Sequence, residues 1–80
     1  MNKISFEVKA RVSTKVDTSN PIVVYDTRVW EEGSGGRICL FSQTYLLRTD
    51  AILAGRREAV KYKKAKELEA TLDRPYMEEV

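Results

Sequence analysis

Histidine is absent from the 80-residue sequence, and cysteine occurs once, at Cys39. Histidine is the side chain most often used as a general base at neutral pH, and it is a common metal ligand. A single cysteine without histidine provides neither a base-activated thiol nor a zinc cluster. Glu31 and Glu32 are adjacent carboxylates, but neighbours on a strand point to opposite faces. We therefore expect no catalytic residue, no metal, no cofactor and no small-molecule substrate.

Disulfides and long apolar segments are also missing. Cys39 has no partner within the chain, whereas small secreted domains usually depend on disulfides. The longest apolar runs are Ile22 to Tyr25 and Ile38 to Phe41, which are too short to cross a membrane. No apolar leader segment follows Met1. These absences predict a cytoplasmic protein with no membrane association, in which Cys39 packs as a small hydrophobic residue.

Glycine and proline are scarce, at four and two residues, so there is little material for linkers. We expect a single compact domain over residues 1–80, in which the acidic residues 73–80 fray as a tail.

The charges are unevenly distributed. Residues 56–66, the basic segment, contain six cations and one anion (net +5), and residues 67–80, the acidic segment, contain five anions and one cation (net −4).

Three stretches have the pattern of β-strands. Residues 3–13 alternate apolar and polar side chains, as expected for a strand with one buried face. Residues 22 to about 32 are β-rich but place charges among the apolar residues of one face, which suggests a central strand with a bulge or a bend. Residues 37 to about 47 are apolar on both faces. In the first strand, the expected buried face consists of Ile4, Phe6, Val8, Ala10 and Val12. In the second strand, one candidate face consists of Val23, Tyr25, Thr27 and Val29, and the other of Ile22, Val24, Asp26, Arg28 and Trp30.

The glycine-rich stretch from Gly33 to Gly36 lies between the second and third strands. Glycine supplies the left-handed backbone conformations that tight hairpins require. A phosphate-binding loop would need a following lysine and helix, and a strand is expected here instead. The stretch is therefore interpreted as a hairpin turn.

Residues 51 to about 72 consist mainly of strong helix formers. Thr49 or Asp50 is expected to cap this helix, and Gly55 is a candidate position for a kink. Ile52, Leu53, Ala59 and Val60 form one expected packing face, and Tyr62, Ala65, Leu68 and Leu72 form a second face further along. Either the helix kinks or its far half projects and meets something else. The predicted fold is α+β, a three-stranded antiparallel sheet followed by one long C-terminal helix.

A protein-binding role is the favoured interpretation, either as a small adaptor or inhibitor, such as a phage-type regulator, or through self-association. If the helix covers one face of the sheet, the apolar residues of the other face form an exposed strip. Tryptophan and arginine commonly anchor such contacts. The predicted partner-binding residues are Trp30, Arg28, Ile22, Val24 and Leu40, with Leu46 continuing the strip.

Nucleic-acid binding is the alternative. A twisted sheet with basic residues and one aromatic on its open face can lie in a DNA groove or stack on bases. The strand–strand–strand–helix order resembles, in topology, the sheet-reading modules of phage-type integrases and AP2-like domains. The candidate contacts are Lys9, Arg11 and Arg37 on the sheet and Arg56, Arg57, Lys61 and Lys64 on the helix. A competing interpretation is that the helical cations are solvated and form pairs such as Lys66–Glu69.

Overall fold

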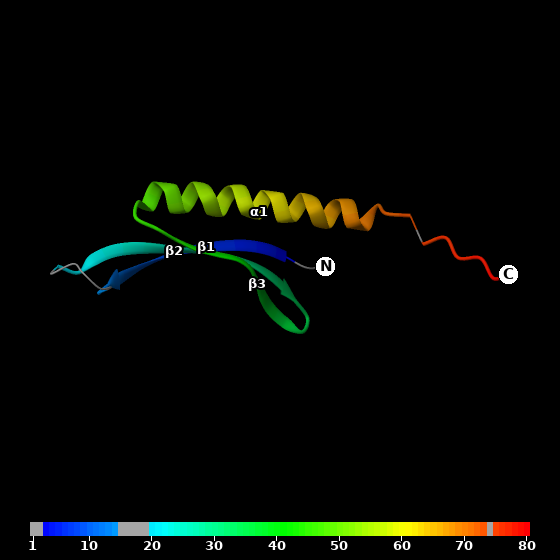
Figure 1. The fold of residues 1–80 in the computed structure, drawn as a ribbon, viewed down its shortest axis with the longest axis horizontal. Helices are drawn as coiled ribbons and strands as arrows, with labels where there is room; N and C mark the ends of the chain where they lie inside the picture. The colour runs from blue at the N-terminus through cyan, green and yellow to red at the C-terminus, as the bar shows by residue number, and fades with distance from the viewer. Residues whose placement is uncertain (1–2, 15–19, 74) are drawn as a thin grey trace.

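The computed structural model of the chain describes residues 3–14, 20–73 and 75–80. It contains three strands and one helix in the predicted order, which confirms the α+β fold (Figure 1). The elements are β1 (Lys3–Ser13), β2 (Ile22–Gly33), β3 (Gly36–Tyr45) and α1 (Arg48–Ala70).

The three strands form one antiparallel sheet in the order β1-β2-β3. The β1–β2 register runs without interruption from Lys3 opposite Glu32 to Ser13 opposite Ile22. In β2–β3, Val29 lies opposite Phe41 but Trp30 lies opposite Cys39, so one residue of β3, Leu40, is extra. The predicted central position of the second strand is confirmed, but the extra residue of the bulge belongs to the neighbouring strand β3 and not to β2.

The turn between β2 and β3 is the hairpin expected from its glycines. Gly33 and Gly36 are paired, which leaves Ser34 and Gly35 as the two-residue connection. Gly36 has φ +116°, a backbone conformation that residues other than glycine rarely adopt. The conformational need of this one position explains why the turn contains glycine.

Helix α1 covers one face of the sheet, the face to which Phe6, Thr27 and Val29 belong (Figure 1). Thr27 and Val29 are fully buried. The Thr27 hydroxyl donates a hydrogen bond of 2.9 Å to the carbonyl oxygen of Ala51 in the first turn of the helix. This buried bond satisfies the only polar group of Thr27's side chain and ties the start of α1 to the central strand.

The helix packs through small residues, which corrects the predicted packing face. Ala51, Ala54 and Gly55 are its buried residues, whereas Leu53 and Val60 are exposed. Gly55 lies so close to the sheet that a Cβ atom would collide with the Phe6 ring and lie 3.0 Å from Thr27 Cγ2. The prediction favoured large apolar side chains, but the backbone of α1 approaches the sheet closely only where side chains are small. Gly55 permits this approach and does not kink the helix, which is continuous in Figure 1.

Two local assignments from the sequence are also wrong. Leu47 is the N-cap residue and makes no side-chain cap hydrogen bond, so neither Thr49 nor Asp50 caps the helix. Both lie within the first turn, where the carboxylate of Asp50 still complements the helix dipole. Cys39 is exposed, with its thiol 3.3 Å from the Phe41 carbonyl oxygen, because it lies on the face of the sheet away from α1.

The helix is displaced along the sheet, so that each layer extends past the other at one end (Figure 1). At the end where β1 finishes and β2 begins, Val12 and Val23 face each other beyond the start of α1 and are 62% and 51% exposed. The expectation that Val12 is buried is therefore wrong. At the other end α1 passes the β2–β3 hairpin, and Leu68 and Leu72 are 67% and 74% exposed. Tyr76 and Met77 continue away from the sheet and do not fold back onto it.

The fit at Gly55 gives a first prediction. Gly55→Ala should lower the free energy of unfolding by up to about 2 kcal/mol, because overpacking costs about 1–3 kcal/mol and the helix propensity of alanine offsets about 1 kcal/mol. Urea denaturation followed by circular dichroism measures this change. Gly35→Ala is the control, because nothing lies within 4 Å of its added Cβ. Equal midpoints for the two variants would contradict the close approach.

Candidate interaction surfaces

The face of the sheet away from α1, here called the open face, has opposite charges on adjacent strands. Glu7 of β1 lies directly across from Arg28 of β2, and Lys9 lies directly across from Asp26. Cross-strand pairs of opposite sign stabilise a solvated sheet surface, each by about 0.2–1 kcal/mol. The open face therefore carries charges of both signs and is not uniformly basic.

Asp26 is the centre of a polar network on this face. Arg11 Nε donates to Asp26 Oδ2 at 2.8 Å and Arg11 Nη2 to Oδ1 at 3.2 Å, and the Thr44 hydroxyl donates to Oδ1 at 2.6 Å. The hydrogen bonds from Arg11 and then Thr44 lower the pKa of Asp26 to about 2. The same carboxylate raises the pKa of Arg11. One side chain from each strand is thereby joined across the whole width of the sheet.

Trp30 is half-buried between an anion and a cation. Its indole Nε1 donates to Glu7 Oε1 at 3.0 Å, and the guanidinium carbon of Arg37 lies 4.0 Å from the ring centroid. A cation over an indole ring is a favourable electrostatic contact. The polar atom and one face of the ring are therefore already engaged within the chain.

The predicted apolar strip is not continuous, although the helix does cover the opposite face as the prediction required. Val24 is buried, Leu40 is half-buried at the bulge, and Ile22 is 43% exposed at the strand end. Asp26 and Arg28 lie between Val24 and Trp30 along β2. A contact between these residues and a partner stays a prediction, but the structure does not bring them together as one apolar surface.

The cations proposed for nucleic-acid binding form two separate groups. Lys9, Arg11 and Arg37 belong to the sheet, and α1 carries the others on the opposite side. Lys61 Nζ lies 2.7 Å from Glu58 Oε2, which raises the pKa of this lysine. The remaining helical cations of that group, Arg56, Arg57 and Lys64, are exposed.

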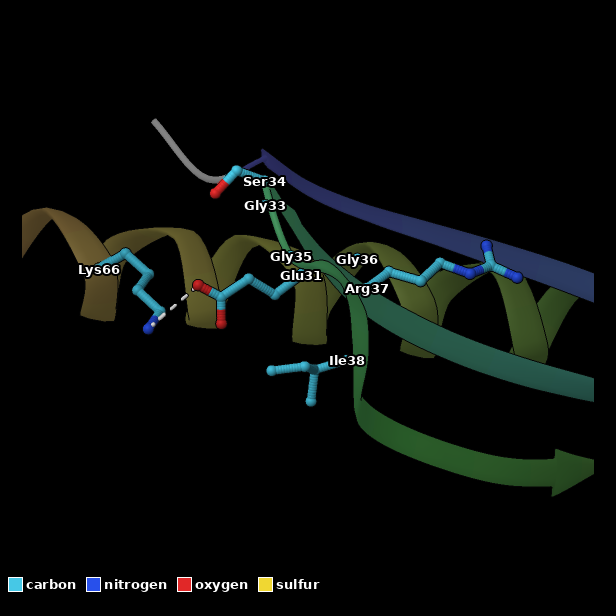
Figure 2. Close-up of a pocket in the computed structure, with 8 residues that line it drawn as sticks. All are labelled: Glu31, Gly33, Ser34, Gly35, Gly36, Arg37, Ile38 and Lys66. Atoms are coloured by element: carbon cyan, nitrogen blue, oxygen red, sulfur yellow. Dashed lines mark ion pairs between the residues drawn. The ribbon is translucent and has the colours of Figure 1, made fainter.

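A pocket of about 480 Å³ lies between the β2–β3 hairpin and α1, and Lys66 is the helix residue that lines it. Lys66 Nζ lies 3.2 Å from Glu31 Oε2 and 3.6 Å from Glu69 Oε2 (Figure 2). The carboxylate of Glu31, above all, raises the pKa of Lys66. Arg37, the other cation of the pocket, points away from Lys66 (Figure 2). Because Glu31 balances the charge of Lys66, the pocket does not have the character of a phosphate site, in agreement with the interpretation of the glycines as a turn.

The Lys66–Glu69 pair was predicted from its helical spacing and is confirmed. The Lys66–Glu31 pair was missed, because 35 positions separate the two residues and only the position of α1 on the sheet brings them together. No sequence signal identifies it.

The exposed apolar side chains gather at the two displaced ends of the molecule. At one end are Val12, Ile22 and Val23 of the sheet with Leu46 and Leu47 of the connection to α1. At the other end, and on the outer side of α1, are Val60, Leu68, Leu72, Tyr76 and Met77. Of the predicted second helix face, Leu68 and Leu72 are exposed. Tyr62 of the same predicted face is half-buried, and its hydroxyl donates a hydrogen bond of 3.0 Å to the Leu40 carbonyl oxygen, so this face does not project as a whole.

No protein-family model, curated protein or solved structure matches the chain. Within the described ranges, no group of three or more His, Cys, Asp or Glu side chains is placed to hold a metal ion. In the same part of the chain, no helix is long and apolar enough to cross a membrane.

The Asp26 network gives a prediction about pH. A pKa lowered in the folded state stabilises the fold above the unfolded-state pKa of about 3.9, and this contribution disappears as the pH falls towards 2. The stability difference between wild type and Asp26→Asn should therefore be largest above about pH 4 and should shrink as the pH falls to 2. Chemical denaturation over pH 2–6 measures it, with exposed Asp73→Asn as the control. A difference that does not change with pH would contradict the role of Asp26.

Proposed function

We propose that this chain is a non-enzymatic protein-binding module that docks through the outer side and projecting end of α1. The observation that supports this most strongly is the exposed surface. The chain exposes 6930 Å², whereas a compact monomer of 9.2 kDa exposes about 4,900 Å². Its radius of gyration is 18.2 Å, against about 12 Å for a compact domain of 80 residues. A partner would cover part of this excess.

The small core supports the same proposal. In the described part of the chain, the buried apolar residues are Val24, Val29, Ala51 and Ala54. Many large apolar residues, including Leu68 and Leu72, remain exposed. Exposed apolar residues in one region of a surface are typical of protein interfaces. Docking would bury side chains for which this fold provides no cover.

The open face is the less suitable docking surface. Protein interfaces are depleted of charged residues at their centre, because each charge must lose its water. Around Trp30, the charged groups Glu7 and Arg37 already engage the ring. A partner on this face would have to disrupt these contacts or bury them. Trp30 and Arg28 are therefore better suited to the rim of an interface than to its centre.

Nucleic-acid binding has less support than protein binding. The sheet cations are interleaved with Glu7 and Asp26, and the helical cations lie in the other layer. A dedicated phosphate-binding surface would instead present many cations on one side. A module that docks through a single helix suits the role of an adaptor or inhibitor that occupies a surface on a larger protein.

Site-specific photo-crosslinking tests the proposal. A photoreactive amino acid at position 68, on the projecting part of α1, should give covalent protein adducts in cells that produce the chain. The same amino acid at position 9, on the open face, should give few adducts. Nuclease treatment should leave the adducts at position 68 unchanged. The reverse pattern, with adducts at position 9, or adducts that nuclease removes, would contradict the proposal.

A further inference from the structure

We infer that β1 pairs with β1 of a second copy of the chain in the antiparallel direction, with Val8 on the two-fold axis. The two three-stranded sheets then form one sheet of six strands. This inference goes beyond the proposed function, because it uses an edge of the sheet and not α1. Three features of β1 support it: an open edge, a row of poorly covered apolar side chains, and an order of charges that complements itself when the strand is reversed.

Strand β1 is an edge of the sheet along its whole length. In the described part of the chain it pairs with β2 alone, over 11 residues and without a break in register. Every second residue of an edge strand directs its N–H and C=O groups away from the sheet, where another strand can bind them. The opposite edge, β3, contains the extra residue Leu40, and a bulge of this kind hinders further pairing. Strand β1 is therefore the edge that is suited to accept another strand.

The side of β1 that faces α1 lacks cover. Its apolar residues are Ile4, Phe6, Val8, Ala10 and Val12. The first three are half-buried and the last two are exposed, whereas Thr27 and Val29 of the neighbouring β2 are fully buried. Helix α1 lies over Thr27 and contacts β3 through the hydrogen bond of Tyr62, and it leaves the outer margin of β1 without cover. The side chains of a strand added at this edge would pack against this row.

Pairing about Val8 places apolar residues of the two copies opposite each other. A two-fold axis perpendicular to the sheet keeps both helices on one face, so residues that lie opposite each other point to the same side. Val8 then lies opposite Val8, and Ile4 lies opposite Val12. The large ring of Phe6 lies opposite the small side chain of Ala10. At about 4.5–5.5 Å between Cβ atoms, such cross-strand neighbours contact each other, so the two rows form one apolar layer on the side of the helices.

The charges of β1 select this register. With the axis at Val8, Glu7 of each copy lies opposite Lys9 of the other, and the remaining cations of the strand lie opposite serines. An axis at Glu7 would place two glutamates opposite each other, and Lys3 opposite Arg11. An axis at Lys9 would place two lysines opposite each other. Opposite charges across a strand pair stabilise it, and like charges destabilise it. The Val8 axis also pairs all 11 residues of β1, because Val8 is the central residue of the strand.

Lys9 and Glu7 are both able to make this contact. Lys9 is exposed and lies across from Asp26 of β2, but the carboxylate of Asp26 is held by Arg11. Among the described residues, Lys9 therefore has no ion-pair partner of its own. Glu7 accepts the hydrogen bond of Trp30 through Oε1, and a carboxylate can accept further bonds through its second oxygen. A second copy thus supplies the anion that Lys9 lacks.

The exposed surface is large enough for this pairing and for a partner on α1. The chain exposes about 2,000 Å² more than a compact monomer of its mass, and a standard interface takes about 800 Å² from each partner. The two-fold axis lies at the edge of the sheet, so the outer side of α1, which points away from the sheet, stays accessible.

A charge exchange on β1 tests the pairing. Glu7→Lys and Lys9→Glu each place like charges opposite each other at both symmetry-related positions. The double variant Glu7→Lys/Lys9→Glu exchanges the two charges, so the opposite pairs return. It carries the cost of both substitutions to the folded monomer, including loss of the bond from Trp30, so its recovery reports the pairing and not the fold. Lys64→Glu is the control, because Lys64 is exposed like Lys9 but lies on α1.

Sedimentation equilibrium at low salt measures the outcome, and circular dichroism checks that each variant is folded. We expect wild type to form a dimer of twice 9.2 kDa. Each single variant should dimerise at least about tenfold more weakly. The double variant, and an equimolar mixture of the two single variants, should dimerise within about threefold of wild type. Lys64→Glu should leave dimerisation unchanged.

Several results would overturn the inference. Wild type that sediments as a monomer at every concentration contradicts it, and so do single variants that dimerise as strongly as wild type. A double variant as weak as the single variants contradicts the Val8 axis, and loss of the dimer in Lys64→Glu would move the contact to α1.

The outcome is separable from that of the proposed function. Photo-crosslinking tests the proposed function through adducts with other proteins. A self-adduct at position 9, with twice the mass of the chain, supports the β1 pairing alone. Its absence, together with a monomeric wild type, removes the pairing and leaves the proposed function in place.

Discussion

The close approach of α1 to the sheet at Ala51, Ala54 and Gly55 is the contact on which the rest of the structure depends. The approach is possible because these residues are small and because Gly55 leaves room for the Phe6 ring. The hydrogen bond from Thr27 to the Ala51 carbonyl fixes the start of the helix at this point. Further along α1, the Tyr62 hydroxyl donates a hydrogen bond to the Leu40 carbonyl oxygen and Lys66 pairs with Glu31, so contacts with the sheet also position the later turns.

The position of the anchor explains the uneven exposure of the molecule. At about 1.5 Å per residue, the 23-residue helix is about 34 Å long, and its buried residues all belong to the first two turns. The anchor lies at Thr27, well inside β2, so Val12 and Val23 at one end of the sheet receive no cover. At the other end the helix passes the hairpin and leaves Leu68 without sheet contacts. One displacement therefore produces both exposed apolar ends.

The two faces of the sheet differ in how far their side chains are already paired or covered within the chain. On the open face, polar side chains of β1, β2 and β3 are joined in networks such as Arg11–Asp26–Thr44, and these need water or one another but no further protein. On the helix side, one helix does not cover all of the apolar residues, so Val12 and Val23 of the sheet and Leu68 of the helix stay exposed. This asymmetry is the physical reason to propose that the binding surface lies on α1.

Local patterns were sufficient to predict the strands, the hairpin and the long helix. Alternation over residues 3–13, the glycines at 33–36 and the helix formers after residue 50 each depend on neighbours within a few positions. The charge order of the helix and the absence of histidine are likewise properties of the sequence alone. Only the tertiary structure decided that Gly55 marks the packing face, that Cys39 is exposed and that Lys66 meets Glu31. Each of these depends on which face of the sheet α1 covers and on where it lies along that face, a relation between segments far apart in the chain that no local pattern encodes.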